Sequence, residues 1–204
     1  MTCLEQMRES RIVPVVVLDQ AEDAVATADA LIAGGVSVME ITMRTDAALK
    51  AIENVAVHCP KMLVGAGTVK NLQQCKLAVA AGAKFTVSPG FSKEIVSYCR
   101  GNQIPCLPGC VTATEIMEAM ELGVRVIKFF PANIYGGISA MKALSAPFGE
   151  ISFIPTGGVN EKNVKEYLDQ PFIWAVGGSW ICTKQDIKDK NFDKITKLCI
   201  QARE

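Results

Sequence analysis

Short runs of apolar, often β-branched residues alternate with longer stretches of helix-forming residues along this chain, and the alternation repeats eight times. Runs of this kind predict buried strands, and the stretches between them carry apolar residues at helical spacing. The expected strands are Ile12 to Leu18, Val38 to Thr42, Leu63 to Ala66, Phe85 to Ser88, Pro105 to Leu107, Val126 to Phe129, Ser152 to Pro155 and Trp174 to Val176. The expected helices are Ala21 to Ala33, Ala47 to His58, Leu72 to Ala81, Glu94 to Arg100, Thr112 to Leu122, Ile138 to Ser145 and Val164 to Leu168.

Strands that alternate with helices along a chain pair in parallel through right-handed crossovers. Eight such units in 204 residues fit an α/β fold of the (β/α)8 TIM-barrel type, near the lower size limit of that architecture. No linker, low-complexity tract or shift in composition divides the chain, so residues 1–204 are expected to form a single domain. Glycines follow three expected helices, at Gly34-Gly35, Gly82 and Gly123, where a left-handed residue can end a helix.

Charge and cysteine content exclude several classes of protein. The chain has 21 Lys and Arg against 21 Asp and Glu, without a basic cluster, so neither nucleic acid nor a membrane surface is an expected partner. Its eight cysteines form no C-x-x-C pair, and the N-terminus does not resemble a signal peptide, which predicts reduced thiols and a cytoplasmic location. His58 is the only histidine, which argues against a His-based metal site or a Ser-His-Asp triad.

Lys128 interrupts an otherwise apolar strand just before Phe129-Phe130-Pro131. An apolar setting disfavours an ammonium ion, so a buried lysine is either paired or held ready as a neutral amine nucleophile. A neutral amine adds to ketones, and the resulting iminium withdraws electrons during cleavage of a carbon–carbon bond. The alternative is a lysine with a buried stem whose head reaches water or a carboxylate.

Glu40 interrupts another expected strand, and active sites of such barrels lie at the carboxyl ends of the strands. If Glu40 meets Lys128 in the interior, it can act as general acid and base during formation of the iminium. The alternative is a buried ion pair with a purely structural role, although such pairs seldom stabilise a fold enough to explain their presence.

Glycine pairs follow the seventh and eighth expected strands, as Gly157-Gly158 and Gly177-Gly178-Ser179. In a barrel of this type, backbone N–H groups at these two strand ends commonly bind phosphate. Glycines also simply form tight turns, but two pairs at adjacent strand ends favour an anion site. Arg44 offers a planar fork for a carboxylate and Thr68 a further donor, although each alone is typical of a surface or capping residue.

These residues resemble the 2-keto-3-deoxy-6-phosphogluconate (KDPG) and 4-hydroxy-2-oxoglutarate aldolases, which are class I aldolases on a (β/α)8 barrel. The resemblance runs from about Arg11 to Lys197. Its blocks are Glu40-Ile41-Thr42-Met43-Arg44-Thr45, Val64-Gly65-Ala66-Gly67-Thr68-Val69, Ser88-Pro89-Gly90, Lys128-Phe129-Phe130-Pro131-Ala132, Pro155-Thr156-Gly157-Gly158-Val159 and Gly177-Gly178-Ser179-Trp180. Ile41, Met43 and Cys110 depart from the residues expected at their positions, which leaves the chemistry intact and the choice of substrate open.

The resemblance implies a role for each matching residue. Lys128 would form the Schiff base, and Glu40 would be the general acid and base, acting with a water. Arg44 and Thr68 would bind the pyruvyl carboxylate, with Thr45, Pro89 and Phe130 nearby. Gly157, Gly158, Gly178 and Ser179 would receive the phosphate. The resemblance also implies a homotrimer that uses neither a metal nor another cofactor.

The resulting hypothesis is an aldehyde-lyase that reversibly cleaves KDPG to pyruvate and glyceraldehyde 3-phosphate. An aldolase for 4-hydroxy-2-oxoglutarate or 2-keto-3-deoxy-6-phosphogalactonate would use the same lysine and remains an alternative. A phosphosugar isomerase or epimerase would use the glycine site without a covalent amine. A non-catalytic phosphate-binding barrel would bind ligand without turnover, and the placement of Lys128 and Glu40 on strands argues against it.

Overall fold

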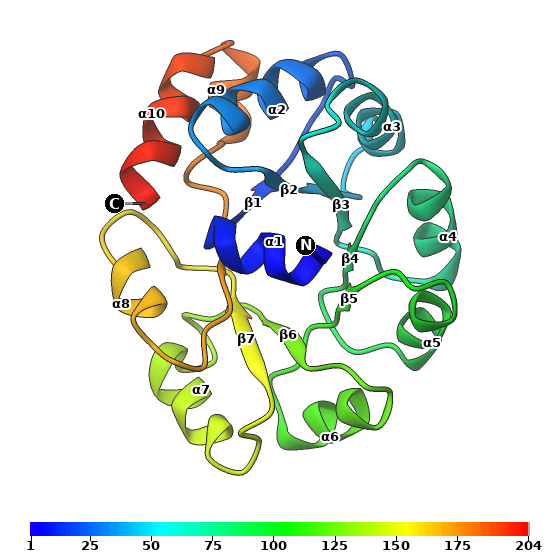
Figure 1. The fold of residues 1–204 in the computed structure, drawn as a ribbon, viewed down its shortest axis with the longest axis vertical. Helices are drawn as coiled ribbons and strands as arrows, with labels where there is room; N and C mark the ends of the chain where they lie inside the picture. The colour runs from blue at the N-terminus through cyan, green and yellow to red at the C-terminus, as the bar shows by residue number, and fades with distance from the viewer. Residues whose placement is uncertain (204) are drawn as a thin grey trace.

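A computed structural model describes residues 1–203 and shows an α/β fold in which helices surround parallel strands (Figure 1). The strands are β1 (Ile12–Val16), β2 (Val38–Thr42), β3 (Leu63–Gly67), β4 (Thr86–Val87), β5 (Cys106–Leu107), β6 (Val126–Phe129), β7 (Ser152–Pro155) and β8 (Val176–Gly178). The helices are α1 (Cys3–Ser10), α2 (Asp23–Ala33), α3 (Ala48–His58), α4 (Leu72–Ala80), α5 (Lys93–Gly101), α6 (Ala113–Glu121), α7 (Gly137–Ser145), α8 (Val164–Leu168), α9 (Lys184–Lys188) and α10 (Phe192–Arg203).

The strands form two parallel sheets that face each other around a common interior. Six strands lie in the order β5-β4-β3-β2-β1-β8, and β6 pairs with β7 in a second sheet. Isolated parallel bridges join the sheets at both seams. One bridge joins Gly109 to Lys128 on one side, and two join Phe153 to Ile173 and Thr156 to Gly177 on the other. The predicted parallel α/β fold is therefore confirmed, while the hydrogen-bonded ladders are shorter than a continuous eight-stranded sheet would give.

Several predicted boundaries are wrong, and the eighth strand differs most. It was expected over Trp174 to Val176 but spans Val176–Gly178, because Gly177 and Gly178 pair with Val13 and Pro14 of β1. The predicted first strand extends two residues too far, since β1 ends at Val16. The fourth is reduced to Thr86–Val87, where the Ser88 hydroxyl donates to the Gly90 carbonyl and the chain turns away.

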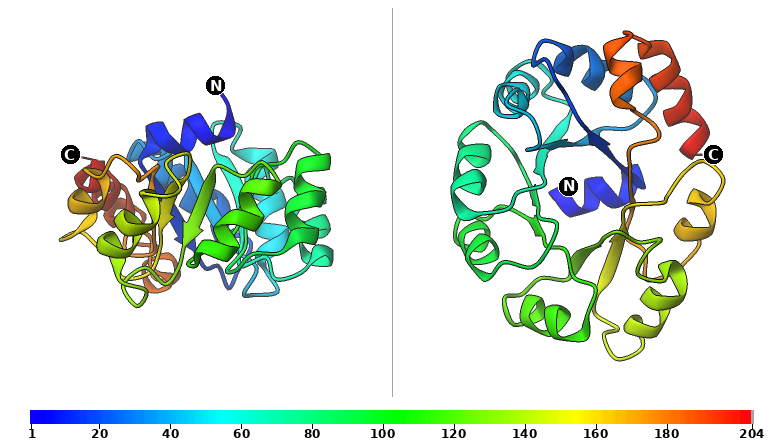
Figure 2. Two further views of the ribbon diagram at one scale, coloured as in Figure 1. Left: turned by 90° about the horizontal axis from the view of Figure 1, so that it is seen from below. Right: turned by 180° about the vertical axis from the view of Figure 1, so that it is seen from behind.

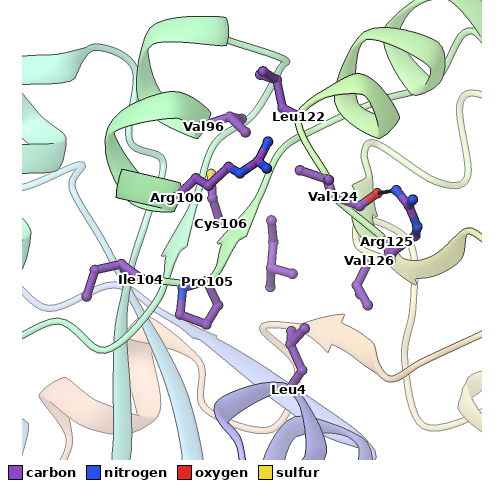
Figure 3. A pocket seen from close by; sticks show the side chains of 12 residues that line it. Leu4, Val96, Arg100, Ile104, Pro105, Cys106, Leu122, Val124, Arg125 and Val126 are labelled. Atoms are coloured by element: carbon purple, nitrogen blue, oxygen red, sulfur yellow. Dashed lines mark hydrogen bonds between the residues drawn. The ribbon is translucent and has the colours of Figure 1, made fainter. Parts of the chain in front are cut away.

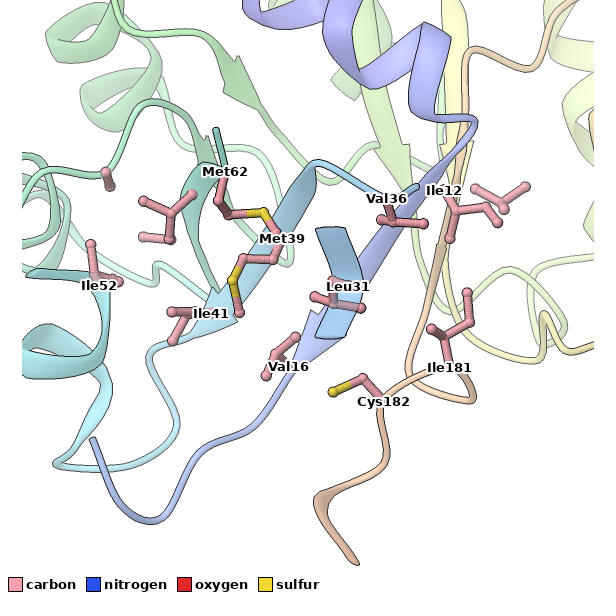
Figure 4. Close-up of a cluster of buried hydrophobic side chains, with 14 of the residues drawn as sticks. Ile12, Val16, Leu31, Val36, Met39, Ile41, Ile52, Met62, Ile181 and Cys182 are labelled. Carbon is pink, nitrogen blue, oxygen red and sulfur yellow. The ribbon is translucent and has the colours of Figure 1, made fainter. Parts of the chain in front are cut away.

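Two hydrophobic layers hold the strands in place. The outer layer lies between strands and helices, and Figure 4 shows part of it, where Met39 and Ile41 of β2 pack with Leu31 of α2 and Ile52 of α3. The inner layer fills the space enclosed by the strands and consists of Met7, Val13, Val38, Leu63, Phe85, Val87, Leu107, Val126, Ile154 and Ala175. Because side chains alternate along a strand, β2 directs Val38, Glu40 and Thr42 inward.

Helix α1 lies across the amino-terminal end of the strands, as Figures 1 and 2 show. It begins with a capping box formed by Thr2 and Glu5, a pattern readable in the sequence that the prediction did not use. Met7 projects from α1 into the inner layer and is fully buried, and the Trp174 indole donates to the Leu4 carbonyl at 2.8 Å. Helix α1 therefore covers this end of the strands.

A cavity of about 390 Å³ lies at the same end, beside β5 and β6 (Figure 3). Its walls are mainly apolar, with the side chains of Leu4, Pro105 and Val126 among them, and Arg100 and Arg125 are the charged residues of the lining. It is remote from the carboxyl ends of the strands. Within residues 1–203, no helix has the length and apolar character needed to cross a membrane.

Candidate active site

Lys128 and Glu40 meet inside the ring of strands. Lys128 comes from β6 and Glu40 from β2, and the Lys128 Nζ atom lies 3.4 Å from Glu40 Oε1. Their side chains are 5% and 3% exposed. The contact expected from the sequence is thus present, and each charge has the other as a buried counter-charge. The residues around the pair bear on whether it is a structural ion pair or takes part in catalysis.

Two glycines near this pair occupy positions where a side chain would not fit. A Cβ atom at Gly67 of β3 would collide with the carboxylate of Glu40, so Glu40 occupies space that any other residue at position 67 would fill. A Cβ atom at Gly109 would collide with the carbonyl of Pro89, and Gly109 is bridged to Lys128. Neither glycine was given a role from the sequence.

An open cavity of about 340 Å³ lies at the carboxyl ends of the strands. Its lining includes most of the residues that the sequence analysis singled out for substrate binding, namely Arg44, Phe130, Gly157, Gly158, Gly178 and Ser179. Lys128 is not on the lining of this cavity, but its Nζ atom is 5.1 Å from the centre of the ring of Phe130, which is. Phe130 therefore stands between the cavity and the buried amine.

Arg44 and Thr68 are held together on the β2 and β3 ends. The Arg44 Nε atom donates to Thr68 Oγ1 at 3.0 Å, and Thr68 adopts a left-handed conformation with φ of 56°. The remaining guanidinium nitrogens of Arg44 are available to an anion. Thr45, by contrast, uses its hydroxyl to donate to the Leu18 carbonyl at 2.5 Å, which ties the end of β2 to the chain after β1.

The glycines at the cavity are required by the backbone and by packing. Gly157 and Gly158 have φ angles of +91° and +81°, which residues other than glycine rarely adopt. A Cβ atom at Gly178 would collide with the ring of Trp180 instead of entering the cavity. The backbone conformation at Gly157 and Gly158 and the packing of Trp180 on Gly178 are therefore enough to explain these three glycines. Their backbone also lines the cavity.

Two further polar residues line the cavity that the sequence analysis missed, Thr183 and Lys184. Thr183 is the N-cap of α9, and its side chain accepts from the Asp186 N–H at 3.1 Å. Lys184 lies next to it and pairs at 2.9 Å with Asp19, which is itself about half exposed. A threonine followed three residues later by an acidic residue is a cap signal that could have placed this helix.

The thiols near the cavity do not compete with the lysine as nucleophiles. Burial raises the pKa of the Cys110 thiol to about 12, and it likewise raises the pKa of Cys182. Both side chains are almost fully enclosed and remain protonated at neutral pH. Cys110 therefore acts as a small apolar residue behind β6, which accounts for its departure from the expected pattern.

Comparison with known proteins shows the family of this chain. The family model described as KDPG and KHG aldolase matches residues 3–198. A 2-dehydro-3-deoxy-phosphogluconate aldolase of Treponema pallidum is 44% identical over 98% of this chain and 96% of its own. A KDPG aldolase structure from Legionella pneumophila, with pyruvate captured at low pH as a covalent carbinolamine intermediate, is 42% identical, with a TM-score of 0.95 over 99% of this chain and 98% of that one. The KDPG aldolase of Zymomonas mobilis ZM4 with 3-phosphoglycerate is 38% identical, with a TM-score of 0.89 over 97% and 93% of the two chains.

Proposed function

This chain belongs to the family of KDPG and KHG aldolases, and we propose from that premise that it reversibly cleaves KDPG to pyruvate and glyceraldehyde 3-phosphate. The chain is thus a carbon–carbon lyase. The observation that supports the residue assignment most directly is the 3.4 Å contact between Lys128 and Glu40 beneath an open cavity.

The reaction begins when the neutral amine of Lys128 adds to the C2 ketone and gives a carbinolamine. Glu40 then donates a proton to the departing hydroxyl, which leaves as water while the nitrogen lone pair forms the C=N bond. The iminium accepts the electrons of the C3–C4 bond as that bond breaks, and a base removes the proton of the C4 hydroxyl. The aldehyde departs, the enamine is protonated at C3, and hydrolysis releases pyruvate and the free lysine.

We assign the pyruvyl carboxylate to Arg44 and Thr68, whose side chains are bonded to each other at 3.0 Å. Thr45 and Pro89 lie at the adjoining strand ends, where Thr45 anchors the end of β2 and the Pro89 carbonyl packs against Gly109. Phe130 forms the wall between the lysine and the open cavity. A planar guanidinium suits a carboxylate because it can donate two parallel hydrogen bonds.

The phosphate is assigned to the backbone at Gly157, Gly158 and Gly178 and to the side chain of Ser179. Lys184 and Arg44 are the cationic residues on the cavity lining, which includes no acidic residue. This charge balance favours an anionic substrate, and KDPG, with a phosphate and a carboxylate, carries more negative charge than the dicarboxylate 4-hydroxy-2-oxoglutarate. It does not distinguish KDPG from its galactonate-derived epimer, which carries the same phosphate.

Trapping with sodium borohydride tests the central assignment. With pyruvate present, we expect reduction to leave a stable secondary amine on Lys128, which peptide mapping by mass spectrometry would locate. Lys128→Ala should give neither adduct nor turnover, while Lys142→Ala, in the exposed last turn of α7, should give both. Full activity in the Lys128→Ala protein would contradict the mechanism.

Substrate choice needs a second measurement. We expect kcat/KM to be higher with the phosphorylated than with the unphosphorylated aldehyde in the direction of synthesis. Ser179→Ala and Lys184→Ala should lower kcat/KM for the phosphorylated aldehyde alone, while Lys165→Ala on α8 should change neither value. Equal losses for both aldehydes would reject the phosphate assignment. Cleavage rates of the two C4 epimers would then decide between gluconate- and galactonate-derived substrates.

The remaining expectations concern the molecule as a whole. We propose that the two sheets act as one closed (β/α)8 barrel in a single domain, supported by the bridges at both seams. We further propose a homotrimer in the cytoplasm. Light scattering during gel filtration tests the trimer, and a single cooperative unfolding transition followed by two spectroscopic probes tests the single domain.

A further inference from the structure

Three thiols and one hydroxyl meet between α4, α5 and the two short strands β4 and β5. The Cys75 Sγ atom of α4 lies 3.4 Å from Cys99 Sγ of α5, and Thr86 Oγ1 of β4 lies 3.3 Å from the same sulfur. The thiol of Cys106, on β5, is also hydrogen-bonded to Cys99. All eight cysteines of the chain are free, so Cys99 is the centre of a cluster of reduced thiols.

The neighbours of Cys99 favour its thiolate form. Hydrogen bonds from Cys106 and then Cys75 lower the pKa of Cys99, with a smaller contribution from Thr86, and burial opposes them. The hydrogen bond to Cys99, together with burial, raises the pKa of Cys106, so Cys106 keeps its proton. Thiolates, and not thiols, are the nucleophiles in reactions of cysteine. Cys99 and Cys106 therefore share one proton in one hydrogen bond, and the proton can move from Cys106 to Cys99.

The cavity of about 390 Å³ at the amino-terminal end of the strands reaches this cluster at one thiol. Cys106 belongs to its lining and is partly exposed, whereas Cys75 and Cys99 are fully buried and do not line it. Arg100 is on the same lining (Figure 3), and a nearby guanidinium stabilises a thiolate. A small oxidant that enters this cavity therefore meets Cys106 before the other two thiols.

We propose that Cys106 and Cys99 form a modification site at which a small hydroperoxide oxidises the two thiols to a disulfide. Cys106 passes its proton to Cys99, and the Cys106 thiolate attacks one oxygen of hydrogen peroxide. The O–O bond breaks and gives a Cys106 sulfenic acid and hydroxide, which takes the proton from Cys99 and leaves as water. The Cys99 thiolate then attacks the Cys106 sulfur, the S–S bond forms, and a second hydroxide departs. Each sulfur loses one electron, and the peroxide gains both.

The third thiol of the cluster offers Cys99 a second possible partner. Cys75 is in direct contact with Cys99, but both side chains are fully buried, so a peroxide has no path to that pair. We therefore expect the disulfide to join Cys99 to Cys106 and Cys75 to stay reduced. The site lies at the opposite end of the strands from the proposed aldolase site, and its chemistry does not depend on that proposal.

The test is a peptide map of reduced protein that is treated briefly with hydrogen peroxide and then alkylated under denaturing conditions. We expect the Cys99–Cys106 disulfide to form at least about tenfold faster than any oxidation of Cys110, a fully buried thiol on the same tryptic peptide as Cys106. Cys110→Ala should form the disulfide at the original rate, and dithiothreitol should reverse it. A disulfide between Cys75 and Cys99, a Cys106 that stays reduced, or equally fast oxidation of Cys110 would overturn the proposal.

Two variants, each confirmed as folded by circular dichroism, test the order of the steps. Cys99→Ala removes the thiol that resolves the sulfenic acid, so peroxide should leave a sulfenic acid on Cys106 that dimedone traps. Cys106→Ala removes the thiol on the cavity lining, so Cys75 and Cys99 should stay reduced under the same exposure. A folded Cys99→Ala protein without a dimedone adduct on Cys106, or a Cys106→Ala protein that still forms a disulfide at Cys99, contradicts entry through the cavity.

Discussion

The side chains of Lys128 and Glu40 are both buried inside the ring of strands, so each charge is stabilised mainly by the other. Removing one partner of a buried ion pair leaves an uncompensated charge, which typically costs about 3 to 5 kcal/mol. A substitution that deletes either side chain therefore mixes chemistry with stability. Amide and methyl substitutions, which change less, separate the two effects better.

Glu40→Gln replaces the carboxylate with a group of the same shape that still accepts a hydrogen bond from Lys128. We expect the fold to persist and turnover to fall by about 10²- to 10⁴-fold, because the general acid and base is lost. Circular dichroism and steady-state cleavage rates provide the check. Glu53→Gln, in the exposed pair with Lys50, serves as the control and should retain full turnover. A Glu40→Gln protein that loses only stability would make Glu40 a structural partner of Lys128.

Gly67→Ala tests the space reserved for Glu40. The added methyl group would collide with the Glu40 carboxylate, so we expect turnover of the folded protein to fall by about tenfold or more. Gly65→Ala is a matched control on the same strand, since its methyl group would meet the ring of Phe85 instead. Both variants should lose about 1 to 3 kcal/mol of stability through overpacking, and the Gly65→Ala protein should keep its turnover. Equal turnover in the two variants would show that Gly67 serves packing alone.

Among the secondary-structure elements, prediction succeeded where apolar periodicity carries the information. β2, β6 and β7 match their predicted bounds, because each is a short cluster of apolar residues, broken by a charge only at Glu40 in β2 and at Lys128 in β6. β8 does not, since backbone pairing with β1 draws glycines into the ladder against their low strand propensity. α10 was missed because half of its residues are polar, and only Ile195 and Cys199 are buried along it.

The charged residues of the candidate site could be predicted from the sequence, whereas the residues that shape the space around them could not. Charged residues inside apolar strands identified Lys128 and Glu40, because burial of a charge is visible in the sequence. The spaces at Gly67 and Gly109 depend on register between strands, which the sequence does not specify locally. Lys184 was missed since its helix is short and follows a loop whose path depends on the packing of Trp180.

Asp186 joins α9 to α10 beside the cavity. Its carboxylate accepts from Lys194 Nζ at 2.8 Å and from the Thr183 hydroxyl at 2.6 Å, and these bonds, with Lys194 first, lower the pKa of Asp186 below its ordinary value. We expect Asp186→Asn to lower the free energy of unfolding by about 1 to 3 kcal/mol at neutral pH. The Asp189→Asn protein, altered at an exposed carboxylate in the same turn, should lose less.

The pH dependence of that loss has a definite sign. A carboxyl group with a lowered pKa in the folded state stabilises the fold above its unfolded pKa, and that stability disappears as pH falls through the folded pKa. The difference between the original and Asp186→Asn proteins should therefore be largest near neutral pH and vanish in strong acid. Denaturant titrations at several pH values measure it, and a difference that grows toward acid would contradict the assignment.

On the scale of the whole molecule, the two ends of the strands differ in what they carry. The carboxyl ends carry the open cavity, whereas α1 and the inner hydrophobic layer occupy the amino-terminal end. In barrels of this kind, residues at the amino-terminal end usually contribute stability and those at the carboxyl end chemistry. Met7 provides a test of this division, because it joins α1 to the inner layer and is fully buried.

Met7→Ala should lower the free energy of unfolding by about 2 to 5 kcal/mol, as is typical for a large side chain removed from a core. The kcat of the folded protein should stay the same, since the substitution lies at the opposite end from the cavity. Met117→Ala, at a methionine that is 57% exposed, should change stability by less than about 0.5 kcal/mol. A clear loss of kcat in the folded Met7→Ala protein would show that the two ends are coupled.

Because α1 covers the amino-terminal end, the structure also predicts an order of substrate binding and product release. With α1 over that end, the path that we propose for reactants and products runs past the glycines and Ser179 that line the open cavity, while Lys128 is only 4% exposed. If pyruvate is bound to that lysine as proposed, pyruvate is released last and the aldehyde is released first. We therefore expect pyruvate to inhibit cleavage competitively and the aldehyde to give mixed inhibition. In the direction of synthesis the order is reversed, and pyruvate binds before the aldehyde.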